Sequence, residues 1–214
     1  SRSMDFGKTE KATKTLQVAA AFAYLSIVLM DKVSIYYVQN NKVFDLILNI
    51  ADKDTFYNSI NKLNEIEFTG DFLFSEGLLP TKVGYGDGLS IVISDFLTDN
   101  DYQQGLDYLI NKKRDLLCVQ VLSKEELNPT IRGKIHYFDS ETATNDYRKF
   151  VNKDVVKAYH EAVNYITTSL SEFCYARGAN YLLVPDNKSI NQIFMEMFVE
   201  KGVLKWHLFI LLDF

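Results

Sequence analysis

Apolar residues along the chain occur in two patterns, short continuous runs and longer stretches with a spacing of three and four. The short runs are rich in β-branched and aromatic residues and predict buried strands, and the longer stretches predict helices. The predicted strands are residues 33–39, 43–49, 89–94, 116–122, 181–184 and 206–212. The predicted helices are residues 9–30, 52–64, 101–111 and 154–177, and a last helix that begins after Ser189 and closes at Gly202. This alternation predicts an α/β fold with a mostly parallel sheet and helices on both faces.

Residues at the element boundaries support this division. Asn40 and Asn41 stand between the first two predicted strands, where such a pair favours a tight hairpin turn. Ser189 followed by Gln192 predicts a capped start for the last helix, and Gly178 is placed to end the helix before it. The local signals therefore agree with the apolar pattern.

Two segments depart from the simple alternation. Residues 131–151 alternate and carry charges, which predicts a small β excursion at one edge or end of the sheet. Residues 16–30 form the longest apolar stretch, but Gln17 and Ser26 interrupt it. The stretch is also shorter than the roughly 18 residues that a spanning helix needs. We expect a buried helix there and no membrane span in this chain.

Composition and charge narrow the class of protein. The chain has 214 residues, of which 47% are hydrophobic and 14% aromatic, enough for the core of one large domain over residues 1–214. A net charge of -5 and a pI of about 5.3 argue against nucleic acid as a partner, since phosphate binding needs a clustered basic surface. Cys118 and Cys174 lie within apolar patterns, which predicts reduced core thiols and a cytoplasmic location.

Candidate chemistry lies at the ends of two predicted strands. The strand over residues 89–94 leads directly into Asp95, and the last predicted strand leads into Asp213. When the end of the chain is read into its beginning, Asp213 is followed by Ser1 and Ser3 in the pattern Asp-x-Ser-x-Ser-Met. One carboxylate and two hydroxyls in a short loop supply hard oxygen ligands, which suit a divalent cation such as Mg²⁺.

At this motif the chain resembles the von Willebrand factor A domain, whose metal-ion-dependent adhesion site begins with Asp-x-Ser-x-Ser. The resemblance implies a Rossmann-type doubly wound sheet with strand order 3-2-1-4-5-6, whose first strand is supplied by residues 206–213 in a circularly permuted chain. Asp213 and Asp95 would then follow neighbouring strands at the switch point, where ligands bind. Domain termini often lie close together, so permutation is physically easy.

Several explanations of the motif across the chain ends remain open. A true permutation, a strand exchanged between protomers and a rearranged sequence order would all produce it. Alternatively, residues 1–4 are left over from expression and Asp213 merely ends a terminal strand.

The adhesion-site pattern also takes a threonine from the loop between those two strands. Thr69 lies in the expected interval, although the chain reads Thr69-Gly70-Asp71 where members of the family commonly have Gly-Thr-Asp. Thr69 could equally be a helix N-cap or a turn residue. The predicted ligands of Mg²⁺ or Mn²⁺ are Asp213, Ser1, Ser3, Asp95 and Thr69.

Four further sequence segments make the family resemblance more specific. Leu-Ser-Lys-Glu-Glu-Leu-Asn-Pro at 122–129, Phe-Asp-Ser-Glu-Thr at 138–142, Tyr-His-Glu-Ala at 159–162 and Gly-Ala-Asn-Tyr at 178–181 are similar to the bacterial domain-of-unknown-function-58 family. That resemblance implies a von Willebrand A-like domain often found with MoxR-type AAA+ ATPases. Longer relatives carry membrane segments that this chain lacks, so it resembles the isolated domain.

The resemblance implies a protein–protein interaction module, in which an acidic side chain of the partner, such as a MoxR-type ATPase, completes the metal coordination. No catalytic residue is predicted. The main alternative is a magnesium-dependent phosphoryl-transfer or hydrolytic enzyme, although no Walker lysine motif and no Gly-x-Ser-x-Gly elbow are present. His136, His160 and His207 are expected to be structural or exposed. A scaffold domain with a vacant site is the third interpretation.

Overall fold

The computed structural model describes residues 10–68, 74, 86–97, 102–129, 133–137, 147–151 and 153–195. The strands are β1 (Val33–Gln39), β2 (Lys42–Ile50), β3 (Leu89–Ser94), β4 (Asp115–Leu122), β5 (Gly133–Tyr137), β6 (Tyr147–Val151) and β7 (Asn180–Pro185). The helical elements are α1 (Lys11–Val28), α2 (Lys53–Ser59), the 3-10 helix η2 (Ile60–Glu65), α4 (Tyr102–Asn111), α5 (Lys124–Leu127), α6 (Lys153–Ala176) and α7 (Ile190–Gln192). The mixed α/β class predicted from the sequence is confirmed.

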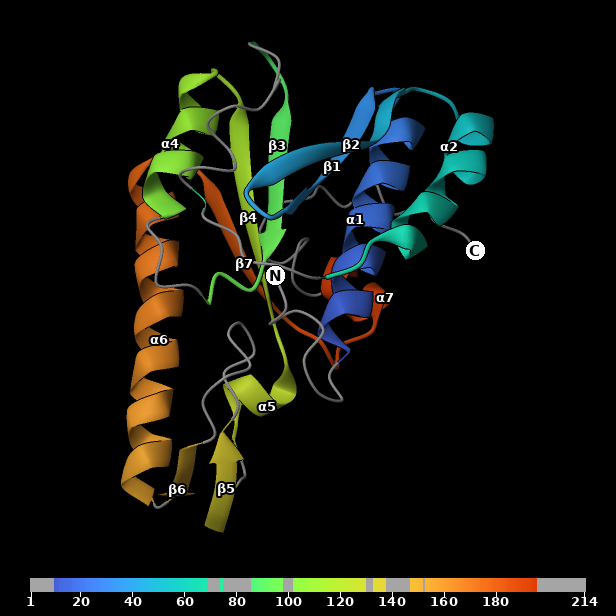
Figure 1. Ribbon diagram of the computed structural model, residues 1–214. Coiled ribbons are helices and arrows are strands. Elements are labelled where there is room, and N and C mark those ends of the chain that lie inside the picture. Colours follow the sequence, from blue (N-terminus) through green and yellow to red (C-terminus); the bar gives the residue numbers. More distant parts are fainter. Residues whose placement is uncertain are drawn as a thin grey trace.

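A parallel three-stranded sheet in the order β3-β4-β7 forms the centre of the molecule (Figure 1). The register pairs Ile91 with Leu117, and Leu117 in turn with Asn180. The mostly parallel character of the predicted sheet agrees with this arrangement. The assignment of these strands as the fourth, fifth and sixth of a doubly wound sheet stays a prediction. The expected first strand, at residues 206–212, lies outside the described residues.

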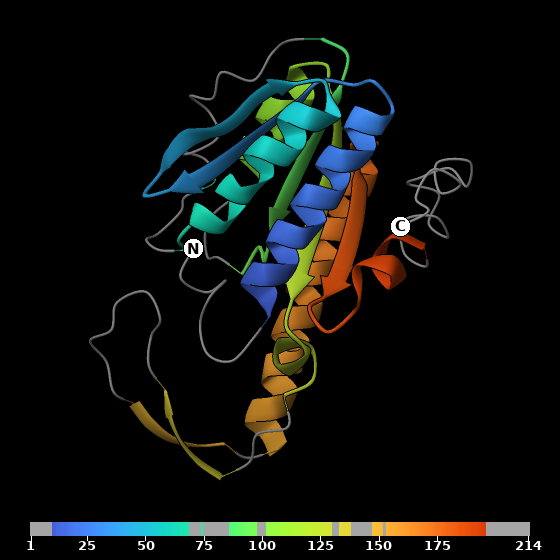
Figure 2. The same cartoon turned by 90° about the vertical axis from the view of Figure 1, so that its right-hand side faces the viewer.

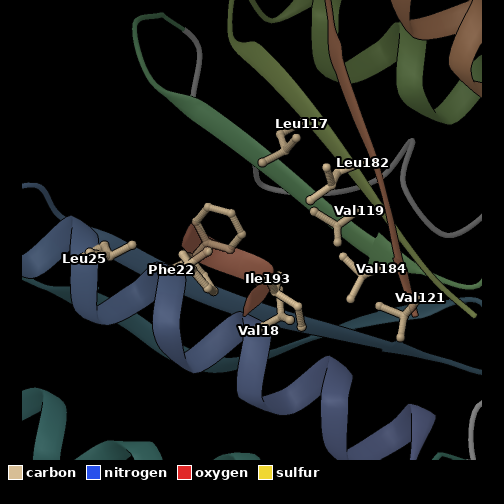
Figure 3. Packing of buried hydrophobic residues seen from close by; sticks show 10 residues of the cluster. Val18, Phe22, Leu25, Leu117, Val119, Val121, Leu182, Val184 and Ile193 are labelled. Atoms are coloured by element: carbon tan, nitrogen blue, oxygen red, sulfur yellow. The ribbon is translucent and has the colours of Figure 1, made fainter. Parts of the chain in front are cut away.

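Helices cover both faces of this sheet (Figure 2). The central strand β4 is therefore buried on both sides. On one face α1 packs its apolar stripe against the strands (Figure 3). The members of this cluster are Val18, Phe22, Leu25, Leu117, Val119, Val121, Leu182, Val184, Ile193 and Phe194. On the other face α4 and α6 pack against alternate residues of β4. The hydrophobic cluster on this second face consists of Phe74, Phe96, Leu106, Leu109, Leu116, Cys118, Leu170, Phe173 and Cys174.

The hairpin β1–β2 has the predicted turn at Asn40 and Asn41. Their φ angles of 49° and 56° are those of a tight turn whose twist matches the flanking strands. Ile47 of the hairpin packs with Ile27 of α1 and Phe56 of α2. Among the described strands the hairpin forms a sheet of its own, separate from β3. The placement of both strands in one doubly wound sheet with β3 therefore stays a prediction.

The remaining predicted elements agree with the structure over the described residues, and residues 196–202 of the last predicted helix lie outside them. The excursion over residues 131–151 is the antiparallel hairpin β5–β6, which lies at one end of the molecule (Figure 1). Gly178 follows α6 with a φ of 67°, and Ser189 and Gln192 form the predicted capping box. The helix predicted over residues 52–64 ends as the 3-10 helix η2, a common way for an α-helix to tighten at its C-terminus.

Both cysteines are free and buried, as expected. A hydrogen bond to the thiol of Cys174, together with burial, raises the pKa of Cys118 and keeps this thiol protonated. In the part of the chain that the structure describes, no helix combines the length and the apolarity needed to cross a membrane.

Candidate functional site

Asp95 lies where the sequence predicts it, at the carboxyl end of β3. Its side chain is almost completely buried, and its Oδ1 accepts a hydrogen bond from the backbone N–H of Leu97 at 3.3 Å. Its Oδ2 lies 3.1 Å from the Nζ of Lys11. A buried carboxylate is costly unless it is paired, and the ammonium group of Lys11 provides that pairing.

Lys11 is the first residue of α1 and is fully buried. Side chains of a helix lean toward its N-terminus, so Lys11 reaches back over the carboxyl edge of the sheet. There its Nζ contacts both Asp95 and the Oε1 of Glu126, the latter at 2.7 Å. A cation in the first turn is unfavourable for the helix dipole. The two carboxylates offset this local cost.

The N-terminus of α5, which follows β4, orients the side chain of Glu126 toward Lys11. The Oε2 of Glu126 accepts the backbone N–H of Ser123 at 2.7 Å, and the Oγ of Ser123 accepts the backbone N–H of Glu126 at 3.1 Å. This reciprocal capping box leaves Oε1 of Glu126 for the ammonium group. Burial and the negative charge of Glu126 raise the pKa of Tyr159, on α6, to about 12.

Asp186 directly follows β7, the third strand of the sheet, in the same region. Its Oδ1 accepts the backbone N–H of Lys124 at 3.0 Å, and its Oδ2 accepts that of Glu10 at 3.2 Å. The buried Asp186 carboxylate therefore ties the start of α5 to the start of α1. Asp95, Glu126 and Asp186 follow β3, β4 and β7, so each parallel strand is followed by an acidic residue at this edge.

The backbone at Asp95 is held by a buried hydrogen-bond chain. The Nε2 of Gln120 donates to the carbonyl oxygen of Asp95 at 2.7 Å, and the hydroxyl of Tyr181 donates to the Oε1 of Gln120 at 2.7 Å. Burial raises the pKa of Tyr181, which keeps this hydroxyl protonated as a donor. Gln120 itself is fully buried. The main-chain position of Asp95 is therefore fixed from the core of the sheet.

Of the five predicted metal ligands, Asp95 is the one that the structure describes. Asp213, Ser1, Ser3 and Thr69 lie outside the described residues. Within the described ranges, no group of three or more His, Cys, Asp or Glu side chains is arranged to hold a metal ion. His160 lies half-exposed on α6, as expected.

The sequence interpretation did not single out Lys11, Glu126, Asp186 or Gln120. Glu126 carried a readable signal, because Ser123 stands three residues before it in the capping-box spacing. Asp186 follows a predicted strand closely, as Asp95 does. Nothing in the local pattern around Lys11 predicts a buried ammonium.

Comparison with known proteins places the chain in a family. The sequence profile described as "Protein of unknown function DUF58" matches residues 1–167, more than half of the chain. The chain belongs to this family. No curated protein matches this DUF58 protein.

Two solved structures are similar to this DUF58 protein over most of their length. One is described as an aerotolerance-related membrane protein from Bacteroides fragilis NCTC 9343 with multiple mutations to serines. It is 11% identical, with 88% of this chain and 89% of that chain covered and a TM-score of 0.44. The other is described as an uncharacterized membrane spanning protein from Vibrio fischeri. It is 10% identical, with 91% and 86% covered and a TM-score of 0.25.

Among the described residues of this DUF58 protein, the positive charge beside Asp95 is an ammonium group. Asp95 and Glu126 each offer one carboxylate oxygen to the same positive charge, which in this structure is the ammonium of Lys11. The Oγ1 of Thr15, one turn further along α1, is buried and has no hydrogen-bond partner among the described residues. At Asp95 the described residues therefore bring together two carboxylate groups and one ammonium group.

Proposed function

We propose that this DUF58 protein is a metal-dependent docking module that binds an acidic side chain of a protein partner. The supporting observation is the buried carboxylate of Asp95 at the carboxyl edge of the parallel sheet, beside the ammonium group of Lys11. In open α/β sheets this edge is where ligands bind. The proposal assigns Asp213, Ser1 and Ser3 as further ligands, brought to the same edge by a von Willebrand A-like first strand. It assigns Thr69 as a ligand from the loop between that strand and β3.

A bound Mg²⁺ or Mn²⁺ would supply positive charge and a coordination position that exchanges its water for another oxygen ligand. Asp95 would bind the metal ion through its carboxylate, and the hydrogen bond from Gln120 to the Asp95 carbonyl oxygen fixes its main-chain position. An acidic side chain of the partner would then make a charge-assisted contact. No catalytic residue is needed for this function, and we propose that the domain has no turnover of its own.

The partner that the family resemblance suggests is a MoxR-type AAA+ ATPase. A pull-down of such an ATPase from the same genome, with Mg²⁺ and then with a chelator, tests the proposal. We expect chelation to release the ATPase and Asp95→Asn to prevent its capture. Asp107→Asn is the matched control, because Asp107 is a surface carboxylate paired with Arg177 away from Asp95.

A parallel assay separates docking from catalysis. The purified protein and its Asp95→Asn variant are tested for phosphatase and nucleotide hydrolysis activity with Mg²⁺ and Mn²⁺. Metal-dependent turnover that is lost in the variant would contradict the docking proposal and favour an enzyme. Capture of the ATPase in the presence of chelator would contradict the metal dependence.

A further inference from the structure

The edge of the sheet opposite Asp95 carries a cavity with cationic side chains in its walls. We propose that this amino-edge cavity binds the phosphate group of an anionic ligand. It lies where α4 and α6 end and β4 begins, and its volume is about 250 Å³. Pockets for drug-sized ligands hold about 300 to 1,000 Å³, so this one suits a phosphate group with a small organic part.

Three cationic side chains line the amino-edge cavity, against one carboxylate. The cations are Lys113, Arg114 and Arg177, and the carboxylate is that of Asp115. The whole chain has a net charge of -5, so this excess of positive charge runs against the average of the molecule. A cleft lined by one sign of charge raises the local concentration of ions of the opposite sign. The cavity therefore favours an anion.

Arg177 is held in position without a ligand. Its Nε and Nη2 donate to the two carboxylate oxygens of Asp107, and its guanidinium lies 3.7 Å from the centroid of the Phe173 ring. Its Nη1 donates no hydrogen bond to any residue that the structure describes. A guanidinium has five N–H donors in one plane, so it can hold Asp107 on one edge and an anion on another.

Arg114, directly before β4, is held in a similar way. Its Nε donates to the Oγ of Ser90 at 3.1 Å, and its Nη2 donates to the carbonyl oxygen of Leu89 at 3.3 Å. Gly88 makes room for this side chain, because a Cβ there would lie 2.6 to 2.9 Å from the guanidinium atoms. Within the described part of the chain, the Nη1 of Arg114 also has no acceptor. Guanidinium groups that are already ordered lose little entropy when they bind an anion.

The side-chain donors at the cavity are not required as helix caps. The last carbonyl groups of α4 accept the backbone N–H groups of Lys112 and Lys113. In α6 the carbonyl groups of Cys174 and Tyr175 accept backbone N–H groups from residues 177–179. The helix ends are therefore satisfied by the main chain, and the guanidinium donors stay available for a ligand.

A phosphate group matches this set of donors. It has three terminal oxygens and a charge of about -1.5 to -2 at neutral pH. Arginine binds phosphate oxygens through pairs of parallel N–H groups, and lysine binds them as a point charge. Two guanidinium groups and one ammonium group, less the carboxylate of Asp115, offset that charge.

Gly178 allows a test that changes the charge of the cavity wall at constant size. It lines the cavity with a φ of 67°, and a Cβ added there would have no atom within 4 Å. Asparagine and aspartate both tolerate this conformation and have nearly the same shape. Gly178→Asp should therefore bind inorganic phosphate at least about fivefold more weakly than Gly178→Asn, because it adds a carboxylate beside the anion.

Lys113→Met is the second variant and should weaken phosphate binding about three- to tenfold. Lys157→Met is its matched control, because Lys157 is an exposed lysine paired with Glu161 near the start of α6, away from the cavity. A nuclear magnetic resonance titration of the purified full chain with sodium phosphate at constant ionic strength measures these affinities. Circular dichroism checks the folding of each variant.

Equal phosphate affinity in Gly178→Asp and Gly178→Asn would overturn the proposal. If these variants do not fold, the lysine pair decides, and an equal effect of Lys113→Met and Lys157→Met would show binding to surface charge alone. That result would also overturn the site.

Co-sedimentation with vesicles that contain phosphatidic acid distinguishes the two sources of a phosphate group. Capture that is kept in Gly178→Asn and lost in Gly178→Asp would assign the cavity to a lipid headgroup. Binding of inorganic phosphate without vesicle capture would assign it to a small soluble phosphate ester. Absence of both would show that the cavity is not a phosphate site.

Discussion

Phe96 has a backbone conformation that non-glycine residues rarely adopt, with a φ of 52° directly after Asp95. The surrounding structure stabilises it in two ways. The Oγ of Ser94 accepts the backbone N–H of Phe96 at 3.1 Å, and the ring of Phe96 stacks on Phe74 with centroids 5.2 Å apart. Strained residues are frequent at functional sites, where the structure determines their geometry. The strain at Phe96 supports Asp95 as a residue whose position matters.

Gln120 gives a test of how Asp95 is held. Gln120→Leu would leave the Asp95 carbonyl and the Tyr181 hydroxyl without their partner in the core. We expect the free energy of unfolding to fall by about 2 to 3 kcal/mol, because buried polar groups without partners are costly. Tyr181→Phe removes only the outer hydrogen bond and should cost about 1 kcal/mol. Urea denaturation of both variants measures the difference, and equal losses would show that Gln120 does not support Asp95.

At the level of single elements, the β1–β2 hairpin depends most on its turn. Asn40 and Asn41 both have positive φ angles, which asparagine tolerates better than branched residues do. The strands on either side pair in register, with Gln39 opposite Lys42. The turn residues therefore select the pairing of the whole hairpin.

The turn predicts an ordered series of variants at Asn41. Asn41→Val should lower the free energy of unfolding by about 1 to 2 kcal/mol, because a β-branched side chain clashes with the backbone at positive φ. Asn41→Gly should cause no loss, since glycine adopts this conformation freely. Denaturant unfolding of the two variants beside the parent is the measurement. If valine and glycine at this position gave equal stability, the turn would not be the determinant of the hairpin.

On the scale of the whole molecule, α1 links the core to the candidate site. Val18 and Phe22 in its middle pack against the sheet, while Lys11 at its start reaches Asp95 and Glu126. Glu10, directly before it, is bound through its N–H to Asp186. The hydrophobic packing of α1 therefore sets where its first turn lies, and the acids at the carboxyl edge of the sheet anchor that turn.

Metal binding should be visible in the stability of the whole protein. A ligand that binds only the folded state stabilises it by mass action, about 2.7 kcal/mol at a hundredfold excess over Kd. For a protein of this size we expect Mn²⁺ to raise Tm by roughly 5 to 10 °C, and Asp95→Asn to abolish the increase. Thermal unfolding with and without chelator is the measurement. A full increase in the variant would place the metal elsewhere.

The predicted circular permutation can be tested by deleting or relocating residues 206–214. If residues 206–213 supply the first strand, deletion of 206–214 should lower the free energy of unfolding by several kcal/mol, and the loss of Asp213 should remove the Mn²⁺ response. A variant in which residues 206–214 precede Ser1 should recover both properties. Unchanged stability and metal response after the deletion would leave 206–213 without the predicted role.

The sequence by itself determined the elements, because they depend on contacts between neighbours. The apolar run from Leu116 to Leu122 predicts a strand buried on both sides, and Asn40-Asn41 and Gly178 carry the turn preferences that end their elements. The same reasoning placed Asp95 directly after a strand, at the carboxyl edge of the sheet, where the structure has it. The four other predicted ligands stay predictions.

Only the tertiary structure decided which charges meet at that edge. Lys11 is 84 residues from Asp95 and 115 residues from Glu126, and the packing of α1 on the sheet brings them together. Local rules would place a lysine at the start of a helix in solvent, since its charge opposes the helix dipole. The free energy of an ion pair depends on distance and burial, and these follow from the fold rather than from the spacing of residues along the chain.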